Sequence, residues 1–176
     1  MNRKLGIVCM VLFAAGALGR AADGLRIVPI VGDDKVLVTF EVADAFTNDV
    51  REAIHSGLRT TFTYDIELRM VVPLWVDRTI ATAVVSTTDQ YDNLTRRHTL
   101  SRTVDGRVDE SSVTEDEGIV RRWLTTLARL PLCSTSKLDP TRDYYVRISA
   151  RARPQSGSLV GWGSAIIGQA KFTFIP

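Results

Sequence analysis

Alternation of apolar and polar residues runs through most of the chain and predicts β-strands. It is clearest over residues 58–72, where every second side chain from Phe62 to Met70 is apolar and those between are polar. This period of two places one face of a strand in a core and the other in water. Weaker or shorter versions of the pattern predict strands at residues 25–31, 35–42, 77–90, 94–104, 107–113, 144–153 and 171–175.

Two segments change to the helical period. Residues 47–57 begin with Thr47, a good N-cap, repeat apolar residues at i, i+4 and i+8, and end near Gly57, a common helix stop. Thr114 to Glu117 has the spacing of a capping box, and the apolar residues after it predict a helix that Pro131 ends. Those apolar residues are Ile119, Val120, Trp123, Leu124, Leu127 and Leu130.

The order of these elements predicts the fold class. Most neighbouring strands are joined by tight turns such as Asp92-Asn93 and Asp105-Gly106, without the alternation of strand and helix that a parallel sheet requires. Pro29 confines the first strand to a sheet edge. We therefore expect a mainly β protein: an antiparallel β-sandwich or sheet of about seven strands, with two short amphipathic helices packed against it.

The first 21 residues have the pattern of a signal peptide. Arg3 and Lys4 precede an uncharged apolar run from Leu5 to Leu18, and small residues follow at the positions that a signal peptidase recognises. The run is shorter than the about 20 apolar residues that a transmembrane helix needs. We expect residues 1–21 to be cleaved off and residues 22–176 to form a single exported domain, periplasmic or secreted. The alternative is an uncleaved N-terminal anchor.

Composition narrows the range of partners. The chain is 45% hydrophobic and 24% charged, as expected for a globular protein. Without Arg3, Lys4 and Arg20, 19 basic residues face 20 acidic ones, so the surplus of Lys and Arg typical of nucleic-acid-binding proteins is missing. We expect no nucleic-acid partner, and no transmembrane span once the signal peptide is removed.

Few residues suit catalysis or metal binding. Cys133 is the only cysteine after the predicted signal peptide, which excludes a disulfide within the domain. His55 and His98 are the only histidines, and neither has the spacing of a metal site. Asp65 and Glu67 lie two apart, as carboxylates on any solvated strand do. We expect no catalytic residue, no metal and no cofactor.

Several short motifs occur in an order that is specific when taken together. They are Gly57-Leu58-Arg59-Thr60-Thr61-Phe62, Tyr64-Asp65-Ile66-Glu67-Leu68, Trp75, Asp77-Arg78, Tyr91-Asp92-Asn93-Leu94-Thr95-Arg96-Arg97, and Leu138-Asp139-Pro140 followed by Tyr144-Tyr145-Val146-Arg147. Over residues 35–176 the chain resembles the bacterial domain of unknown function 4390 family. His98 departs from the resemblance, since the position after the Arg pair is usually a tyrosine. The resemblance implies an exported domain and no assigned activity.

Two basic clusters are the candidate binding surfaces. The possible partner-binding residues are Tyr91, Arg96, Arg97, His98 and Arg102, at the tip and on one arm of the predicted 77–104 hairpin, and Arg107 follows. The second cluster is Arg147, Arg151 and Arg153, on the polar face of a late strand. Either surface suits an envelope protein or an anionic lipid surface, although cations also guard sheet edges against unwanted pairing. The leading hypothesis is a non-catalytic interaction module of the bacterial periplasm; the alternatives are an exported hydrolase of unrecognised type or a carrier of an apolar ligand.

Overall fold

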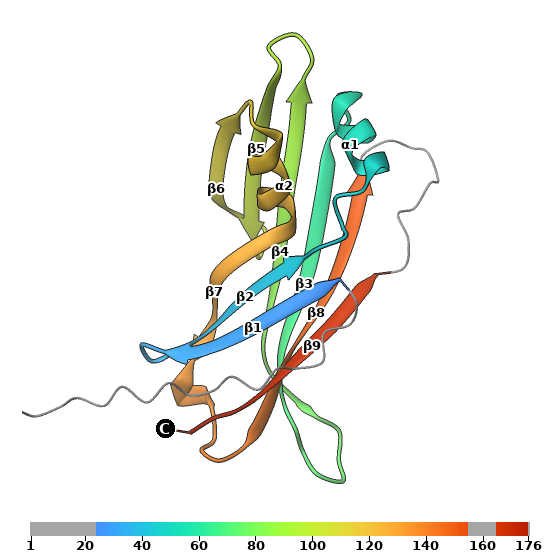
Figure 1. The fold of residues 1–176 in the computed structure, drawn as a ribbon. Helices are drawn as coiled ribbons and strands as arrows, with labels where there is room; N and C mark the ends of the chain where they lie inside the picture. Colours follow the sequence, from blue (N-terminus) through green and yellow to red (C-terminus); the bar gives the residue numbers. More distant parts are fainter. Residues whose placement is uncertain (1–23, 155–164, 176) are drawn as a thin grey trace, which may run out of the picture.

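The structure is a computed structural model that describes residues 24–154 and 165–175, and it is a β-sandwich with two helices (Figure 1). The predicted signal peptide and the loop around Trp162 lie outside the described residues. Its elements are β1 (Leu25–Gly32), β2 (Lys35–Val42), α1 (Asn48–His55), β3 (Thr60–Met70), β4 (Arg78–Asp92), β5 (Arg97–Val104), β6 (Arg107–Thr114), α2 (Glu117–Thr125), β7 (Thr126–Ser134), the 3₁₀-helix η1 (Thr135–Lys137), β8 (Asp143–Pro154) and β9 (Ile166–Thr173).

The larger sheet has six strands in the order β6-β5-β4-β3-β8-β9, and every neighbouring pair is antiparallel. The central strand β3 follows the predicted alternation along its whole length: from Thr60 to Met70, every second residue is buried. Period two therefore gives the sheet an inner, apolar face and an outer, polar one. The strands expected at residues 35–42, 58–72 and 77–104 are confirmed as β2, β3 and the β4–β5 hairpin.

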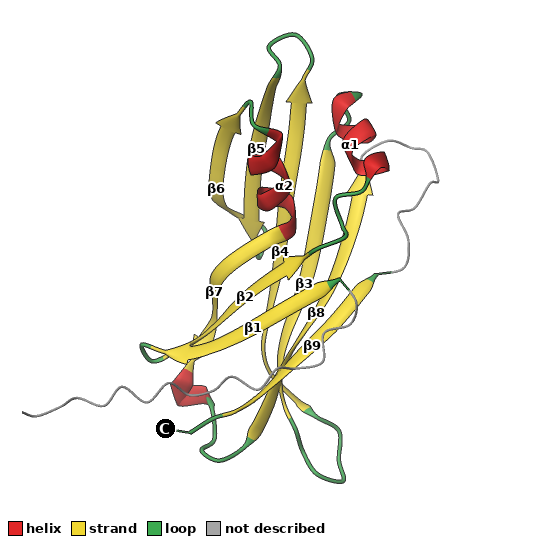
Figure 2. Cartoon of the chain, in the orientation of Figure 1, coloured by secondary structure: helices red, strands yellow, loops and turns green. Residues whose placement is uncertain are grey.

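Two different layers cover the inner face of the large sheet. The smaller sheet, in the order β1-β2-β7, crosses one half of it, while α1 and α2 lie over the other half (Figures 1 and 2). The edges β1 and β9 approach closely, and a Cβ at Gly168 of β9 would come within 2.9 Å of the Leu25 side chain. Gly168 thus lets the two sheets close on that side. Pro29 lies in β1, which is an edge strand as predicted.

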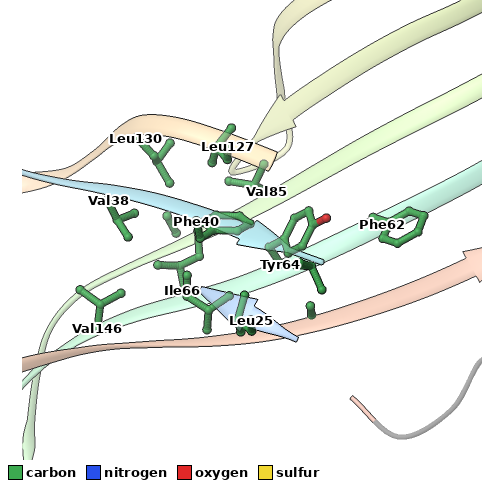
Figure 3. Close-up of a cluster of buried hydrophobic side chains, with 14 of the residues drawn as sticks. Leu25, Val38, Phe40, Phe62, Tyr64, Ile66, Val85, Leu127, Leu130 and Val146 are labelled. Atoms are coloured by element: carbon green, nitrogen blue, oxygen red, sulfur yellow. The ribbon is translucent and has the colours of Figure 1, made fainter. Parts of the chain in front are cut away.

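The core lies between the layers and is built around two aromatic rings (Figure 3). Phe40 of β2 and Tyr64 of β3 are each 1% exposed, and their ring centroids are 4.8 Å apart. The Tyr64 hydroxyl donates to the carbonyl of Leu124, which ties the sheet to the end of α2. Burial raises the pKa of this phenol, so it stays protonated at neutral pH. Burying side chains of this size contributes about 1.5–3 kcal/mol each.

The first helix forms as predicted, and the second begins later and ends earlier than expected. The Thr47 side chain caps α1 by accepting from the Val50 N–H at 3.3 Å. In α2 the N-cap is Asp116 rather than Thr114: its carboxylate accepts from the N–H groups of Gly118 and Ile119. The helix then ends at Thr125, five residues before the expected Leu130.

The segment after α2 is a strand, which corrects the sequence prediction. Residues 126–134 form β7 and pair with β2. Phe40 pairs with Leu127 and Val38 with Leu130, so the single residue between them in β2, Thr39, opposes two residues of β7, Ala128 and Arg129. This β-bulge, with Arg129 at a φ of 54°, puts two buried leucines three positions apart. Buried apolar residues three positions apart are also typical of a helix, which is why the sequence predicted one here. Cys133, expected at a helix end, lies partly buried in this strand.

Within the described residues there are nine strands, against about seven expected, and the antiparallel sandwich with two packed helices is confirmed. In the same part of the chain, no helix is both long and apolar enough to cross a bilayer.

Candidate interaction site

The most unusual surface feature is the loop that joins β3 to β4. Its residues 72–76, here called the apolar loop, are all apolar: Val72, Pro73, Leu74, Trp75 and Val76. The Trp75 N–H donates to the Val72 carbonyl at 3.2 Å, which closes a turn with Pro73 and Leu74 at its centre. Proline favours the first central position of a type I or II turn, and the positive φ of Leu74, 63°, is that of type II.

One carboxylate holds the base of the apolar loop. Asp77 accepts a hydrogen bond from the Val72 N–H at 3.2 Å and from the Tyr145 hydroxyl at 2.8 Å, one on each oxygen. The Arg69 guanidinium donates to the Asp77 carbonyl at 3.1 Å. The hydrogen bonds from the Tyr145 hydroxyl and the Val72 N–H, with the charges of Arg69 and Lys171, hold the pKa of Asp77 below its usual range, so the carboxylate is ionised. The loop therefore extends from a fixed base.

The tip of the apolar loop is exposed to solvent. Leu74, Trp75 and Val76 have 104%, 81% and 74% of their surface exposed. Single exposed apolar residues are ordinary, but three in succession on an anchored loop form a contiguous apolar patch, which marks contact sites. A shallow hollow lies against the same three side chains. This arrangement suits binding to an apolar surface, and it contains no group that performs acid, base or nucleophilic chemistry.

The structure separates the residues predicted as a binding cluster on the β4–β5 hairpin. Arg96 is exposed in the turn, and Arg97 is exposed but paired with Glu115 at 3.1 Å. His98 is 3% exposed and faces the core, opposite to Arg97. Arg102 is mostly buried: it pairs with Glu110 at 2.9 Å and lies 4.3 Å over the ring of Trp123. The expectation of one exposed cationic arm is therefore wrong for His98 and Arg102.

His98 instead belongs to a buried hydrogen-bonded pair at the end of the core. Its Nδ1 lies 3.0 Å from the carboxylate of Asp89, which is fully buried. Tyr91, half-buried, lies between two histidine rings: it is tilted against His98 at a centroid distance of 4.5 Å and edge-on to His55 at 5.5 Å. Burial raises the pKa of Asp89, and the hydrogen bond from His98 opposes this shift. The nearby buried hydroxyls of Thr60 and Thr87 donate to backbone carbonyls, so neither is poised as a nucleophile.

The second predicted basic cluster faces carboxylates across the outer side of the large sheet. Arg151 forms an ion pair with Asp65, and Arg147 lies opposite Glu67 in the register of β3 and β8. These side chains line a shallow open hollow of about 420 Å³. The side chain of Arg153 is outside what the structure describes. Because each described arginine has a carboxylate beside or opposite it, this face is balanced in charge.

Other candidate chemistry is sparse in the part of the chain that the structure describes. No group of three or more His, Cys, Asp or Glu side chains is placed to hold a metal ion among residues 24–154 and 165–175. Burial raises the pKa of the Cys133 thiol, which disfavours the reactive thiolate.

The family model described as a domain of unknown function (DUF4390) matches residues 25–157. The chain belongs to this family. The matched region begins with β1 and extends past the last residue of β8. It includes the apolar loop, the buried Asp89–His98 pair and both helices. No curated protein and no solved structure matches the chain.

Trp75, Asp77 and Arg78 belong to the motifs of the DUF4390 resemblance, but the apolar loop was not predicted as a site. The available signal was an apolar run from Val71 to Val76, interrupted only by Pro73, directly after a strand that was already complete. A run of this kind usually indicates core. Here the run lies in a loop whose base is bonded to Asp77 and whose tip is exposed.

Proposed function

We propose that this chain is an exported protein of the bacterial envelope that works as a non-catalytic binding module, with the apolar loop as its contact element. The N-terminal pattern supports export. The observation that carries the binding role is the exposure of Leu74, Trp75 and Val76 on a loop whose base is held by Asp77. A protein gains nothing in stability from holding three apolar side chains in water, whereas a binding partner gains their burial.

The hairpin tip at residues 93–96 is the competing contact element. It carries Leu94, 95% exposed, but its neighbouring cations are partly engaged within the molecule: Arg97 with Glu115 and Arg102 with Glu110. Strand β6 is an edge of the large sheet whose residues are almost all exposed, with Val108 at 74%. Val76 and Val108 are the same residue type at the same exposure, so they form a matched pair for testing.

The test is site-specific photocrosslinking in intact cells. A photoreactive amino acid replaces Val76 in one variant and Val108 in the other, and both proteins are checked for wild-type circular dichroism. We expect a discrete adduct with an envelope protein or lipid from position 76 and little from position 108. Equal adducts from both positions, or none from position 76, contradict the proposed contact element.

A further inference from the structure

We propose that the partner of the apolar loop is the surface of a lipid bilayer that contains anionic lipid, with Leu74, Trp75 and Val76 inserted at the level of the headgroups. The inference rests on the proposed function and names its partner. It follows from three properties of the loop: its convex shape, the hydrogen bonding of its backbone, and the charges around its base.

Shape is the first property. The three side chains project from a tight turn and are almost fully exposed, so the patch as a whole is convex, with only a shallow open hollow against it. The loop lies at one end of the sandwich beyond the β3 and β4 strands (Figure 1). A convex apolar tip needs a matching pocket on a protein partner, but a bilayer deforms around it. Tryptophan is also the side chain that prefers the membrane interface, where its ring is buried and its N–H remains hydrated.

Backbone hydrogen bonding is the second property. Groups that enter the headgroup region lose water, and their N–H and C=O groups then need other partners. The Val71 N–H donates to the Asp143 carbonyl at 2.9 Å, the Val72 N–H to the Asp77 carboxylate, and the Trp75 N–H to the Val72 carbonyl. Pro73 has no N–H. The base of the loop therefore has its donors satisfied, and at the tip the N–H groups of Leu74 and Val76, which have no partner among the described residues, would stay within reach of water and polar headgroups at the interface.

Charge is the third property. Arg69, Arg78 and Lys171 lie around the loop base; Arg69 is 3.8 Å from the Glu67 carboxylate, and Asp77, which follows the loop, accepts a hydrogen bond on each carboxylate oxygen. Arg78 and Lys171 are exposed and take part in no ion pair within the described residues. The adjacent turn holds Arg142 with Asp139 and Asp143, a net charge of −1, so the cations that face a membrane at this end are Arg78 and Lys171. Cations beside an apolar tip complement anionic headgroups, each contributing about fivefold in affinity.

The test is flotation of the exported protein with two kinds of vesicle, phosphatidylethanolamine containing phosphatidylglycerol and phosphatidylcholine alone. We expect binding to the anionic vesicles, reduced about tenfold or more by Trp75→Ser and by Val76→Asp. Val108→Asp is the matched control and should bind as wild type does. Because every variant carries the same N-terminal segment, any contribution of that segment cancels in the comparison.

Charge and depth are tested separately. Arg78→Ser with Lys171→Ser should weaken binding to anionic vesicles at low salt and leave binding to phosphatidylcholine unchanged, while Arg96→Ser with Arg97→Ser at the far end should change neither. Brominated lipid should quench tryptophan fluorescence in the wild type but not in Trp75→Phe.

Each result separates the two proposals. If wild type does not float, or if Val108→Asp loses as much binding as Val76→Asp, the lipid inference is overturned. If flotation fails while photocrosslinking at position 76 still yields a discrete protein adduct, the contact element stands and its partner is a protein. If both fail, the apolar loop is not a contact element.

Discussion

Leu74 combines two unfavourable features at one residue. It is the most exposed large apolar side chain described, and its backbone has a positive φ, which costs a residue with a Cβ about 1–2 kcal/mol. Glycine or asparagine relieves the backbone cost at this turn position. A leucine held there in spite of both costs indicates that the side chain is used.

The exposure and the positive φ of Leu74 predict that Leu74→Asn affects stability and binding differently. Asparagine tolerates a positive φ and is polar, so Leu74→Asn should leave the free energy of unfolding unchanged or raise it by up to about 1 kcal/mol. The same variant should bind vesicles more weakly. Urea titration and flotation on one preparation check both. A variant that loses stability as well as binding contradicts the assignment, because the leucine would then pack within the fold.

The buried Asp89 depends on a single neighbouring side chain. Its Oδ2 bonds His98, and its Oδ1 has no partner among the described residues. Removing one member of a buried pair leaves the other uncompensated, so His98→Leu should cost about 3–5 kcal/mol at pH 7. Adding Asp89→Asn should recover much of that loss, since the amide carries no charge.

The pH dependence of this loss has a definite sign. The pKa of Asp89 is already raised by burial, and without His98 it should rise further. The folded protein then binds the proton more tightly than the unfolded chain, so the stability of His98→Leu should increase as pH falls toward the unfolded value of about 3.9. Urea titrations at pH 7 and pH 5 measure this. If the loss of stability is the same at both pH values, it comes from packing and not from the charge of Asp89.

At the scale of elements, α2 is fixed to the large sheet by the pair of Trp123 and Arg102. The indole N–H donates to the Ser101 carbonyl at 3.4 Å, and the guanidinium of Arg102 lies over the ring. Trp123→Ala should cost about 2–4 kcal/mol, and Arg102→Ser about 1–2 kcal/mol. Arg96→Ser with Arg97→Ser is the control and should shift the melting temperature little. Equal effects of Arg102→Ser and the control contradict a structural role for Arg102.

Hydrophobic period was sufficient to predict most elements and failed where the backbone is irregular. Strand β3 keeps an unbroken period of two, and its prediction is confirmed. Strand β7 contains a bulge that places Leu127 and Leu130 on one face, and Pro131 follows as it does after many helices. Pro131 is tolerated because β7 is an edge strand. Only the pairing with β2 distinguishes the two interpretations, and pairing is a long-range property.

The candidate site was harder to predict, because exposure depends on the whole fold. Arg97 and His98 are adjacent in sequence but lie on opposite faces of β5, so a basic cluster in the sequence does not form one surface. The apolar loop shows the reverse: its composition indicates core, yet Leu74, Trp75 and Val76 are exposed. Neither outcome follows from local pattern alone.

At the scale of the whole molecule, export and cleavage of the predicted signal peptide can be tested together. Fusing residues 1–24 to a reporter active only outside the cytoplasm should give activity, and the mature protein should begin near Ala22. Leu12→Arg in the same fusion interrupts the apolar run and should abolish activity. Full-length protein that stays in the cytosol with Met1 intact contradicts export.

Strand β4 also fixes a distance. It has 15 residues and runs from the apolar loop to the 93–96 turn at the other end of the sandwich (Figure 1). At about 3.3 Å per residue it spans about 50 Å, and its pairing with β3 and β5 on either side keeps it from bending freely. If the apolar loop is inserted in a bilayer, the length of β4 sets an upper limit of about 50 Å on the height of the 93–96 turn above the lipid. Removing two residues from each paired strand would lower that limit by about 7 Å without exchanging the faces of the sheet.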